Sequence, residues 1–542
     1  MSAPLPLSPV DSGVPPADAW EAQQARRLGW LTAAVVLVGV AWRLTRYLLQ
    51  FPIWGDEGML LVNYFQRGYL DIFGPIDYCQ IAPLLFHWAE ITAIRLFGTG
   101  DLAVRLPALL ACLGSVALFW RLAALTLPPL GRTLAVAILA VSIWPATTGA
   151  LVKPYSSDLF FSLALLVPAA TWFRQPDRLG PLVALTLIAP LAMAGSYPAV
   201  FVAGGISIAL LPDVWRRREG RLWATFVAYN LAVGGAFVAH YLLVGRPHLA
   251  SPTAGTTTDA GMHLYWQAGF PPTSPVALLR WLLLAHIGQT AAYPVGGQSG
   301  ASLATVALAA SGGWLLWKRG QTRLLLVIAG TFALWFVAGV LRKYPYGISC
   351  RLSQHVAPFY CLLAGLGLAG LLARLAEPAR WRGTLAAVGL LAALGVGGIA
   401  RDIWRPYRDE DALWARRVAN DLLAQAGDDP IVLLRPDPMI HPSLLWYLGR
   451  DNDRLARLGV TDPRTLAADG ASVWTVDVVQ LADERATVGG WLGQGWRFTE
   501  RTRPRLKPRE PREPFWECCI DRWVHDPASS RRTMRTIGRP PR

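Results

Sequence analysis

The feature that most constrains the fold of this chain is a series of apolar stretches, each 15 to 23 residues long, that recur along the first 400 of its 542 residues. The stretches are rich in Leu, Ala, Val, Gly and Trp, and polar loops separate most of them. A helix that crosses the hydrocarbon core of a bilayer needs about 20 predominantly apolar residues. The sequence therefore predicts an α-helical polytopic membrane protein rather than a row of soluble domains.

Eleven of these stretches are predicted to be transmembrane helices. They cover residues 29–49, 106–122, 133–152, 159–173, 179–196, 197–211, 222–244, 302–317, 324–340, 358–375 and 385–399. Residues 1–28 are polar and Pro-rich and lack the pattern of a cleaved signal peptide. We therefore expect a disordered cytoplasmic tail over residues 1–28, an uncleaved signal anchor, and a membrane domain over residues 29–400.

Positive charge predicts the orientation of these helices. The segments 215–221, 318–323 and 379–383 are strongly basic, and basic loops stay on the cytoplasmic side. With the N-terminus inside, eleven spans leave the residues after 400 exoplasmic. Only four of the 51 basic residues are Lys, a bias typical of GC-rich bacterial genomes. We expect a bacterial inner (plasma) membrane protein that has the lipid bilayer as a partner and binds no nucleic acid.

Two apolar stretches in the first outer loop, residues 51–103, are too short and too polar to be counted as spans. Residues 59–69 and 83–97 are expected to be amphipathic helices on the outer surface of the membrane. If the second stretch were a span, the basic loops would fall on the wrong side. Residues 276–293 fit the same description.

A change in composition after residue 400 predicts a small C-terminal α/β soluble domain over residues 401–525, followed by a basic tail over residues 526–542. Helices are expected at 403–427 and 441–449, and strands at 428–437 and 471–479. The sequence of this domain shows no glycine-rich phosphate loop and no catalytic triad. An accessory or acceptor-binding role is expected.

This topology places three groups of polar residues on the exoplasmic side. They are Asp56, Glu57, Asp77 and Gln80 in the first loop, Lys153, Tyr155 and Asp158 in the second, and Lys343, Tyr344, Tyr346 and Arg351 in a late loop. Two of the four lysines lie in these outer loops, against the positive-inside tendency. An anionic partner explains them, because Lys and Arg bind phosphate groups.

Each group also has a structural explanation when it is taken alone. Asp56 and Glu57 suit a solvated turn, and residues 342–351 suit an interfacial anchor. Ser157 or Asp158 suits the N-cap of the next helix. Convergence on one side of the membrane favours a functional site. The six cysteines form no CxxC motif, so neither a zinc site nor a disulfide framework is expected.

Five segments in order carry a resemblance to a known family. They are WGDEG (54–58), QIAPLLFHW (80–88), GTGDLAVRLPALL (98–110), KPYSSDLFFSLALL (153–166) and YPYGISCRLSQHVAP (344–358). The chain resembles the GT-C superfamily of membrane glycosyltransferases. Within it, the chain is similar to a bacterial branch that includes protein O-mannosyltransferases, the aminoarabinose transferase of lipid A and lipopolysaccharide galacturonosyltransferases. The resemblance implies about eleven membrane helices with exoplasmic surface helices.

The resemblance also implies roles for individual residues. Asp56 matches the acid that acts as general base, Glu57 matches its neighbour, and Asp158 matches the catalytic acid of the second loop. Expected phosphate-binding residues are Lys153, Lys343 and Arg351, and expected substrate-binding residues are Tyr155, Tyr346 and Gln80. Related sequences often have Lys-Pro-Pro where this chain has Gln80-Ile-Ala-Pro83. Lys153 and Lys343 are the candidates to supply the missing cation.

The reaction implied is transfer of a sugar from a polyprenyl-phosphate donor to an envelope acceptor, which is a glycolipid, a cell-wall polymer or a protein. Asp56, partly desolvated by Trp54, is suited to take the proton of the acceptor hydroxyl, and the cations are suited to stabilise the leaving phosphate. No metal site is predicted. Binding of a divalent cation, Mg²⁺ or Mn²⁺, with the help of Glu57 remains an open alternative, because hard cations bind carboxylate oxygens.

Two other functional classes were weighed against this one. A lipid or glycolipid transporter or flippase would place polar residues near the bilayer midplane, on broken helices within inverted repeats. A polymerase or ligase of envelope glycans would have one large outer loop with Arg and His as its main site. This chain instead has its acidic residues in the first outer loop, and the two halves of its sequence show no repeat of each other. The pattern favours a transferase.

Overall fold

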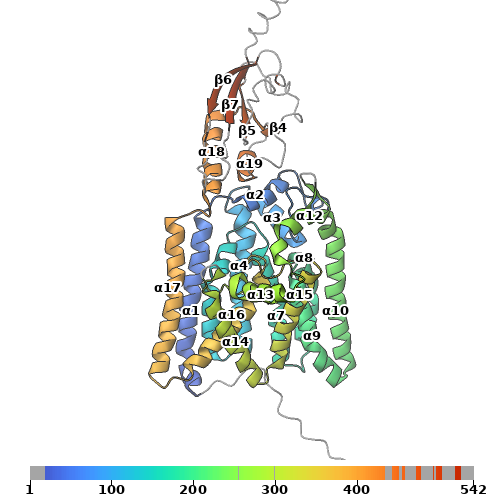
Figure 1. Cartoon of the computed structure of the whole chain (residues 1–542), viewed down its shortest axis with the longest axis vertical. Helices are drawn as coiled ribbons and strands as arrows, with labels where there is room; N and C mark the ends of the chain where they lie inside the picture. The colour runs from blue at the N-terminus through green and yellow to red at the C-terminus, as the bar shows by residue number, and fades with distance from the viewer. Residues whose placement is uncertain are drawn as a thin grey trace, which may run out of the picture. The chain divides into compact units, whose positions relative to one another are not determined.

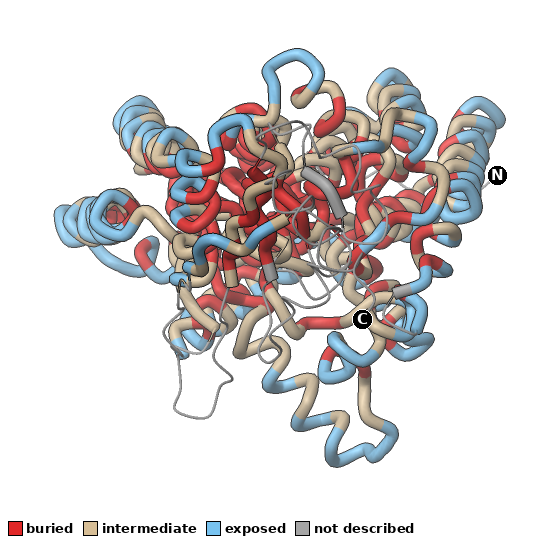
Figure 2. Tube along the Cα trace, turned by 90° about the horizontal axis from the view of Figure 1, so that it is seen from above, coloured by how far each residue is buried: buried red, intermediate tan, exposed pale blue. Residues whose placement is uncertain are grey.

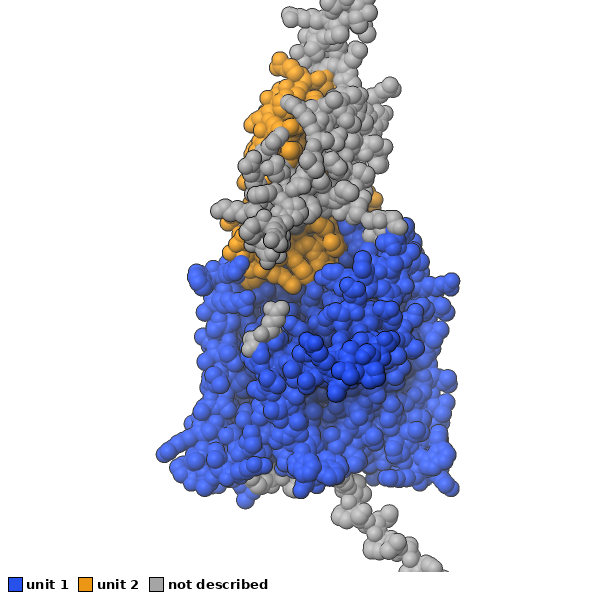
Figure 3. All heavy atoms as spheres, in the orientation of Figure 1, with its two compact units in different colours: residues 1–50, 68–406 blue, residues 51–67, 407–542 orange. Residues whose placement is uncertain are grey.

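The computed structural model describes residues 19–253, 256–297, 300–433, 442–450, 455–457, 472–477, 492, 496–502, 504 and 519–525. The chain folds into two compact units (Figure 3). Unit 1 comprises residues 1–50 and 68–406, and unit 2 comprises residues 51–67 and 407–542. The acidic motif at 54–58 therefore belongs to the same unit as the C-terminal residues.

Unit 1 is a bundle of α-helices (Figure 1). Eight helical segments in the described residues are long and apolar enough to cross a membrane, some of them extended by a short 3₁₀ or π segment. Their α-helices are α1 (Ala19–Leu48), α4 (Leu106–Thr126), α7 (Tyr155–Arg174), α9 (Ala199–Arg217), α10 (Gly220–His240), α15 (Thr322–Val340), α16 (Ala357–Leu372) and α17 (Ala379–Trp404). The remaining predicted spans coincide with the shorter helices α5 (Pro129–Ala140), α8 (Gly180–Gly195) and α14 (Ser302–Lys318). The predicted polytopic helical fold is confirmed.

The first helix begins earlier than predicted. α1 starts at Ala19, inside the segment 1–28 that was expected to be a disordered tail. Residues 19–27 are mostly Ala, Glu, Gln and Arg, which have high helix propensity and extend the helix beyond its apolar part. The rest of the predicted tail, residues 1–18, lies outside the described residues.

The predicted span 133–152 is not one continuous helix. α5 ends at Ala140, and the short helix α6 (Ile143–Thr148) follows it. Pro145 explains the break, because proline lacks the amide hydrogen that bonds the carbonyl four residues earlier, and its ring clashes with that carbonyl. The buried guanidinium of Arg43 in α1 donates to the carbonyl of Ala140 at 2.5 Å and so satisfies the end of α5.

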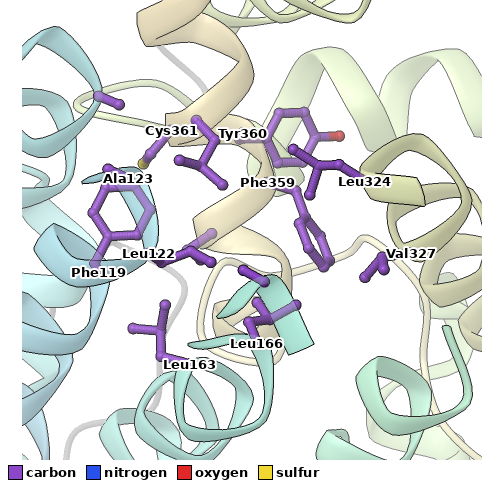
Figure 4. Close-up of a cluster of buried hydrophobic side chains, with 14 of the residues drawn as sticks. Phe119, Leu122, Ala123, Leu163, Leu166, Leu324, Val327, Phe359, Tyr360 and Cys361 are labelled. Carbon is purple, nitrogen blue, oxygen red and sulfur yellow. The ribbon is translucent and has the colours of Figure 1, made fainter. Parts of the chain in front are cut away.

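The core of unit 1 contains side chains from α4, α7 and α16. Figure 4 shows Phe119, Leu163 and Phe359 of these helices among the buried side chains. Most of α16 is buried, whereas few residues of α10 and α17 are buried. Figure 2 shows that the buried residues gather in the middle of the molecule and the exposed ones around its outside. Gly312 in α14 lies so close to α16 that a Cβ there would be 2.0 Å from the carbonyl oxygen of Leu363. Small residues permit such close approach between membrane helices.

Shorter helices flank the long ones. α3 (Leu84–Phe97) confirms the helix expected at 83–97, and Figure 1 shows it near one end of the bundle. α13 (Pro275–Ala285) has no buried residue, which fits the expected surface helix at 276–293. The other short elements are α11 (Arg246–Leu249), α12 (Thr258–Tyr265), and the paired strands β1 (Pro252–Thr253) and β2 (Thr256–Thr257). The side of the membrane that these helices occupy stays a prediction.

Unit 2 contains a five-stranded mixed sheet with the strand order β4-β3-β5-β7-β6. The strands are β3 (Ile431–Leu433), β4 (Leu455–Arg457), β5 (Ser472–Asp477), β6 (Trp496–Thr502) and β7 (Cys519–His525). β3 pairs in parallel with β4 and β5, and β7 is antiparallel to β5 and β6. The helices are α18 (Glu410–Ala426), α19 (Pro442–Gly449) and α2 (Gly55–Leu61), which continues as a 3₁₀ turn over Val62–Phe65. The expected C-terminal α/β fold is confirmed.

Candidate functional site

The clearest contact among the predicted site residues joins two loops of unit 1. The ammonium group of Lys153 donates a hydrogen bond of 2.5 Å to the amide oxygen of Gln80. Gln80 in turn donates to the carbonyl of Tyr78 at 2.9 Å. Both Lys153 and Gln80 are buried. Removing an ammonium group from water is costly unless hydrogen bonds and opposite charge compensate it, and the bond to Gln80 supplies part of this compensation.

The backbone that precedes Gln80 is strained. Tyr78 and Cys79 have φ angles of 66° and 53°, in the left-handed region that favours glycine. Each such residue costs about 1–2 kcal/mol, and the strain persists only where the surrounding structure holds it. The strained turn leads directly into the residue that contacts Lys153.

Three buried histidines gather near Lys153. The rings of His87 in α3 and His248 in α11 lie 5.4 Å apart, and His240 in α10 accepts a hydrogen bond from the amide of Leu84 at 3.1 Å. Burial lowers the pKa of His87 well below its usual value, and the positive charges of His248, His240 and Lys153 lower it further. His87 is therefore neutral near pH 7. This group was not predicted, because the sequence separations of its members give no sign of contact.

Asp158 is buried in the first turns of α7. Its carboxylate accepts a hydrogen bond of 2.7 Å from the hydroxyl of Ser196, which follows α8. The N-cap position of α7 is Pro154, so the interpretation of Ser157 or Asp158 as an N-cap is wrong. Burial raises the pKa of the Tyr344 hydroxyl, and the nearby Asp158 and Tyr155 raise it further. These residues bring the second and the late predicted loops together.

Arg351 makes the second link between these two loops. Its guanidinium carbon lies 5.8 Å from the ring centroid of Tyr155 and 5.7 Å from that of Trp266. A guanidinium at this distance from an aromatic face is attracted to it by the ring quadrupole. The two rings therefore hold the cation of Arg351 beside the second loop, which also carries Lys153.

Tyr346 is buried and has a structural partner. One ring nitrogen of His286 lies 2.9 Å from the Tyr346 hydroxyl, and the other lies 2.8 Å from the Tyr360 hydroxyl. Burial lowers the pKa of His286, so the neutral ring accepts one hydrogen bond and donates the other. The Tyr346 amide also donates to the carbonyl of Gly269 at 2.7 Å. Substrate binding by Tyr346 stays a prediction, and His286 is a partner that the sequence did not indicate.

Lys343 differs from the other two predicted phosphate-binding cations. Its side chain is exposed, and its amide donates to the carbonyl of Ala338 at 2.8 Å where α15 ends. Lys153 and Arg351, in contrast, contact other predicted site residues of unit 1. The structure therefore supports these two more strongly as partners of an anion.

Asp56 and Glu57 occupy the first turn of α2 in unit 2. Glu57 is fully buried, and its carboxylate accepts a hydrogen bond of 3.0 Å from the amide of Trp54, the N-cap residue. The interpretation of this pair as a solvated turn is thus wrong for Glu57, which caps the helix. Asp56 is half-buried. The positive end of the helix dipole favours both carboxylates.

Among the described residues, no group of three or more His, Cys, Asp or Glu is arranged to hold a metal ion. The divalent cation that the sequence left open stays a hypothesis.

The fold is similar to that of known membrane enzymes. No family model and no curated protein matches the sequence. The structure of ArnT from Cupriavidus metallidurans bound to undecaprenyl phosphate matches with a TM-score of 0.53 and 15% identity, over 91% of this chain and 98% of that chain. The apo state of ArnT matches with the same TM-score and 14% identity. ArnT, an aminoarabinose transferase, is a GT-C glycosyltransferase, so the expected GT-C resemblance is confirmed at the level of the fold.

Proposed function

We propose that this protein is an integral-membrane glycosyltransferase that moves a sugar from a polyprenyl-phosphate donor to an envelope acceptor. The observation that carries the proposal is the buried contact between Lys153 and Gln80, accompanied by Arg351 on the ring of Tyr155. Both cations belong to a unit whose fold matches that of ArnT, which was solved with undecaprenyl phosphate bound. A lipid phosphate is the anion that such cations at a membrane domain are suited to bind.

The proposed reaction breaks one bond and forms one. The acceptor hydroxyl oxygen attacks the anomeric carbon, and the bond between that carbon and the phosphate oxygen breaks. The electron pair leaves with the polyprenyl phosphate, whose growing negative charge Lys153 and Arg351 stabilise. The acceptor proton passes to the carboxylate of Asp56, which acts as general base. The products are a glycosylated acceptor and a free polyprenyl phosphate.

Other predicted site residues have supporting roles in this proposal. Gln80 orients the ammonium of Lys153, and Tyr155 orients the guanidinium of Arg351. Glu57 fixes the start of α2 through its bond to the Trp54 amide, and so orients Asp56. Asp158, held by Ser196, is proposed to orient the reacting groups from the second loop. Lys343 and Tyr346 are proposed as further contacts of the donor.

The proposal includes a location. The protein is placed in a bacterial inner membrane, with its N-terminus in the cytoplasm and the C-terminal domain on the exoplasmic side. The basic segments at 215–221 and 318–323 support this orientation, because such loops stay cytoplasmic. Glycolipids, cell-wall polymers and proteins of the envelope are the acceptors that this side of the membrane offers.

A donor panel tests the proposal. The purified full-length protein is incubated with a series of radiolabelled polyprenyl-phosphate sugars, and label released to water or to added envelope extract is measured. Turnover with one donor, together with binding of polyprenyl phosphate, is expected. Folded protein that binds polyprenyl phosphate but turns over no donor would favour the alternative, a lipid or glycolipid flippase.

A further inference from the structure

The segment that carries the acidic motif packs on a helix of the C-terminal domain within unit 2. The amide of Ile53 donates a hydrogen bond of 2.7 Å to the hydroxyl of Tyr447 in α19. Ile53 is fully buried, and Tyr447 is 1% exposed. An unsatisfied buried amide costs about as much as a lost hydrogen bond, so this contact fixes the backbone just before the motif.

A second contact fixes the backbone just after Asp56. Gly58 faces the start of α19, where a Cβ would lie 2.7 Å from the carbonyl carbon of Pro442 and 2.8 Å from the amide nitrogen of Ser443. These neighbours are backbone atoms, which cannot move aside as a flexible side chain does. Only glycine permits α2 to lie this close to α19.

Two aromatic contacts extend the same interface. The rings of Phe65 and Trp446 stack at 5.2 Å with an interplanar angle of 3°. The guanidinium of Arg408, from the segment that leads into α18, lies 3.5 Å from the ring centroid of Trp54. Residues 51–67 are thus held at several points along their length by residues of the C-terminal domain.

We infer that the C-terminal domain is the positioning element for Asp56, and that Tyr447 and Gly58 are its key positioning residues. This inference rests on the proposed function, because it assigns the support of the proposed base. Asp56 lies three residues after Ile53 and two before Gly58, so both anchors act within one helical turn of its carboxylate. A catalytic group must be held within fractions of an ångström, and a short helix on a long loop gains that order only from packing.

The inference changes the role of the C-terminal domain. The sequence alone suggested an accessory or acceptor-binding module. The contacts of α19 instead make the domain a part of the catalytic apparatus, which acts through Asp56 and does not touch the substrate. Loss of these contacts should therefore lower kcat while leaving the affinity for polyprenyl phosphate unchanged.

The test uses the full-length protein and two variants with matched controls. Tyr447→Phe removes one hydroxyl, and Tyr265→Phe removes a hydroxyl from an exposed residue of α12 as its control. Gly58→Ala adds a methyl group against backbone. Gly55→Ala adds the same group in the same helix where nothing lies within 4 Å, and serves as the control for folding.

Hydrogen exchange is measured first, because it needs no substrate. Exchange in peptides that cover residues 51–60 should be roughly fivefold faster in Tyr447→Phe, the ratio that loss of one hydrogen bond of about 1 kcal/mol allows. Tyr265→Phe should match the wild type. Unchanged exchange in Tyr447→Phe would overturn the inference whatever the protein catalyses.

Kinetics then separate the inference from the proposed function. Both variants should lose roughly 10- to 100-fold in kcat, the scale of a small misplacement of a catalytic group, with the Kd for polyprenyl phosphate within twofold of wild type. Tyr447→Phe should cause no further loss in an Asp56→Asn background. If the wild type turns over and both variants keep its full kcat, the inference about the C-terminal domain is refuted and the proposed function stands. A wild type without turnover would refute the proposed function.

Discussion

In unit 1 the candidate cations are fixed by side chains of neighbouring loops, whereas in unit 2 the candidate base is fixed by a helix that lies far along the chain. Lys153 donates a hydrogen bond to Gln80, 73 residues away, and the guanidinium of Arg351 lies over the ring of Tyr155. Ile53, beside the acidic motif, bonds Tyr447, which is 394 residues away. The comparison suggests that donor binding depends on the membrane helices and that the chemical step depends on the C-terminal domain. Variants of the two regions should therefore fail in different ways.

The largest effect in unit 1 is expected for Lys153→Gln. Removing a cation that stabilises the leaving phosphate should lower kcat/KM by roughly 10²–10³ and weaken polyprenyl phosphate binding. The measurement is donor kinetics beside a lipid-phosphate binding assay.

The double variant Gln80→Lys with Lys153→Gln sharpens this prediction. It returns the lysine to the first loop, where related sequences have one, and keeps the amide opposite it. Partial recovery of binding is expected. A double variant no better than Lys153→Gln would mean that the contact is structural and that the phosphate binds elsewhere.

Arg351→Lys should have a smaller effect. The charge stays, but the planar guanidinium that lies over the rings of Tyr155 and Trp266 is lost. A cation–π contact is worth about 0.5–2 kcal/mol, so the Kd for polyprenyl phosphate should rise by roughly 2- to 30-fold. Arg342→Lys is the matched control, because Arg342 lies in the same loop as Arg351 and also contacts an aromatic ring, that of Phe270. An equal effect in both variants would contradict the assignment.

Ser196→Ala should mainly destabilise unit 1. The substitution removes the hydroxyl that donates to the buried Asp158 carboxylate, a loss that costs about 1–3 kcal/mol. The midpoint of thermal unfolding in detergent should fall. Thr225→Ala, which removes a solvent-exposed hydrogen bond at a half-buried position of α10, is the control and should leave the midpoint unchanged. A Ser196→Ala midpoint equal to that of wild type would show that Asp158 has sufficient other partners.

The smallest effect is expected for Cys79→Gly. Glycine adopts a φ of 53° without steric cost, so relief of strain should stabilise the protein by about 1 kcal/mol, less the larger entropy that glycine has in the unfolded chain. The unfolding midpoint should rise slightly or stay constant. A clear fall would mean that the Cys79 side chain itself stabilises the turn, for example against Gly261.

The fold was predictable where a local pattern determines it. All of the predicted spans except 133–152, which is broken after α5, correspond to one continuous helix, because a run of apolar residues has few other ways to satisfy its backbone in a bilayer. The strand β3 and the helix α19 were visible as a buried apolar run and a helical pattern. Pro145, which explains the break before α6, is visible in the sequence, but the apolar residues around it led to the prediction of one continuous span.

The site was predictable in its residue types and not in its contacts. The sequence identifies Lys153 as a cation in an outer loop, against the positive-inside tendency. Its hydrogen bond to Gln80, however, depends on a turn that is strained at Tyr78 and Cys79. The support of α2 by α19 depends on packing between segments almost 400 residues apart, which neither sequence periodicity nor motif spacing predicts. Strands β6 and β7 lie beside Arg- and Pro-rich segments whose composition hid their alternation.

The central claim is that Asp56 is the base of a sugar transfer from a polyprenyl phosphate. The most direct test compares wild type and Asp56→Asn in the donor assay, with polyprenyl phosphate binding measured on the same samples. The account predicts turnover by the wild type, a loss of roughly 10²–10⁴-fold in Asp56→Asn, and equal binding by both. Full turnover by folded Asp56→Asn would contradict it.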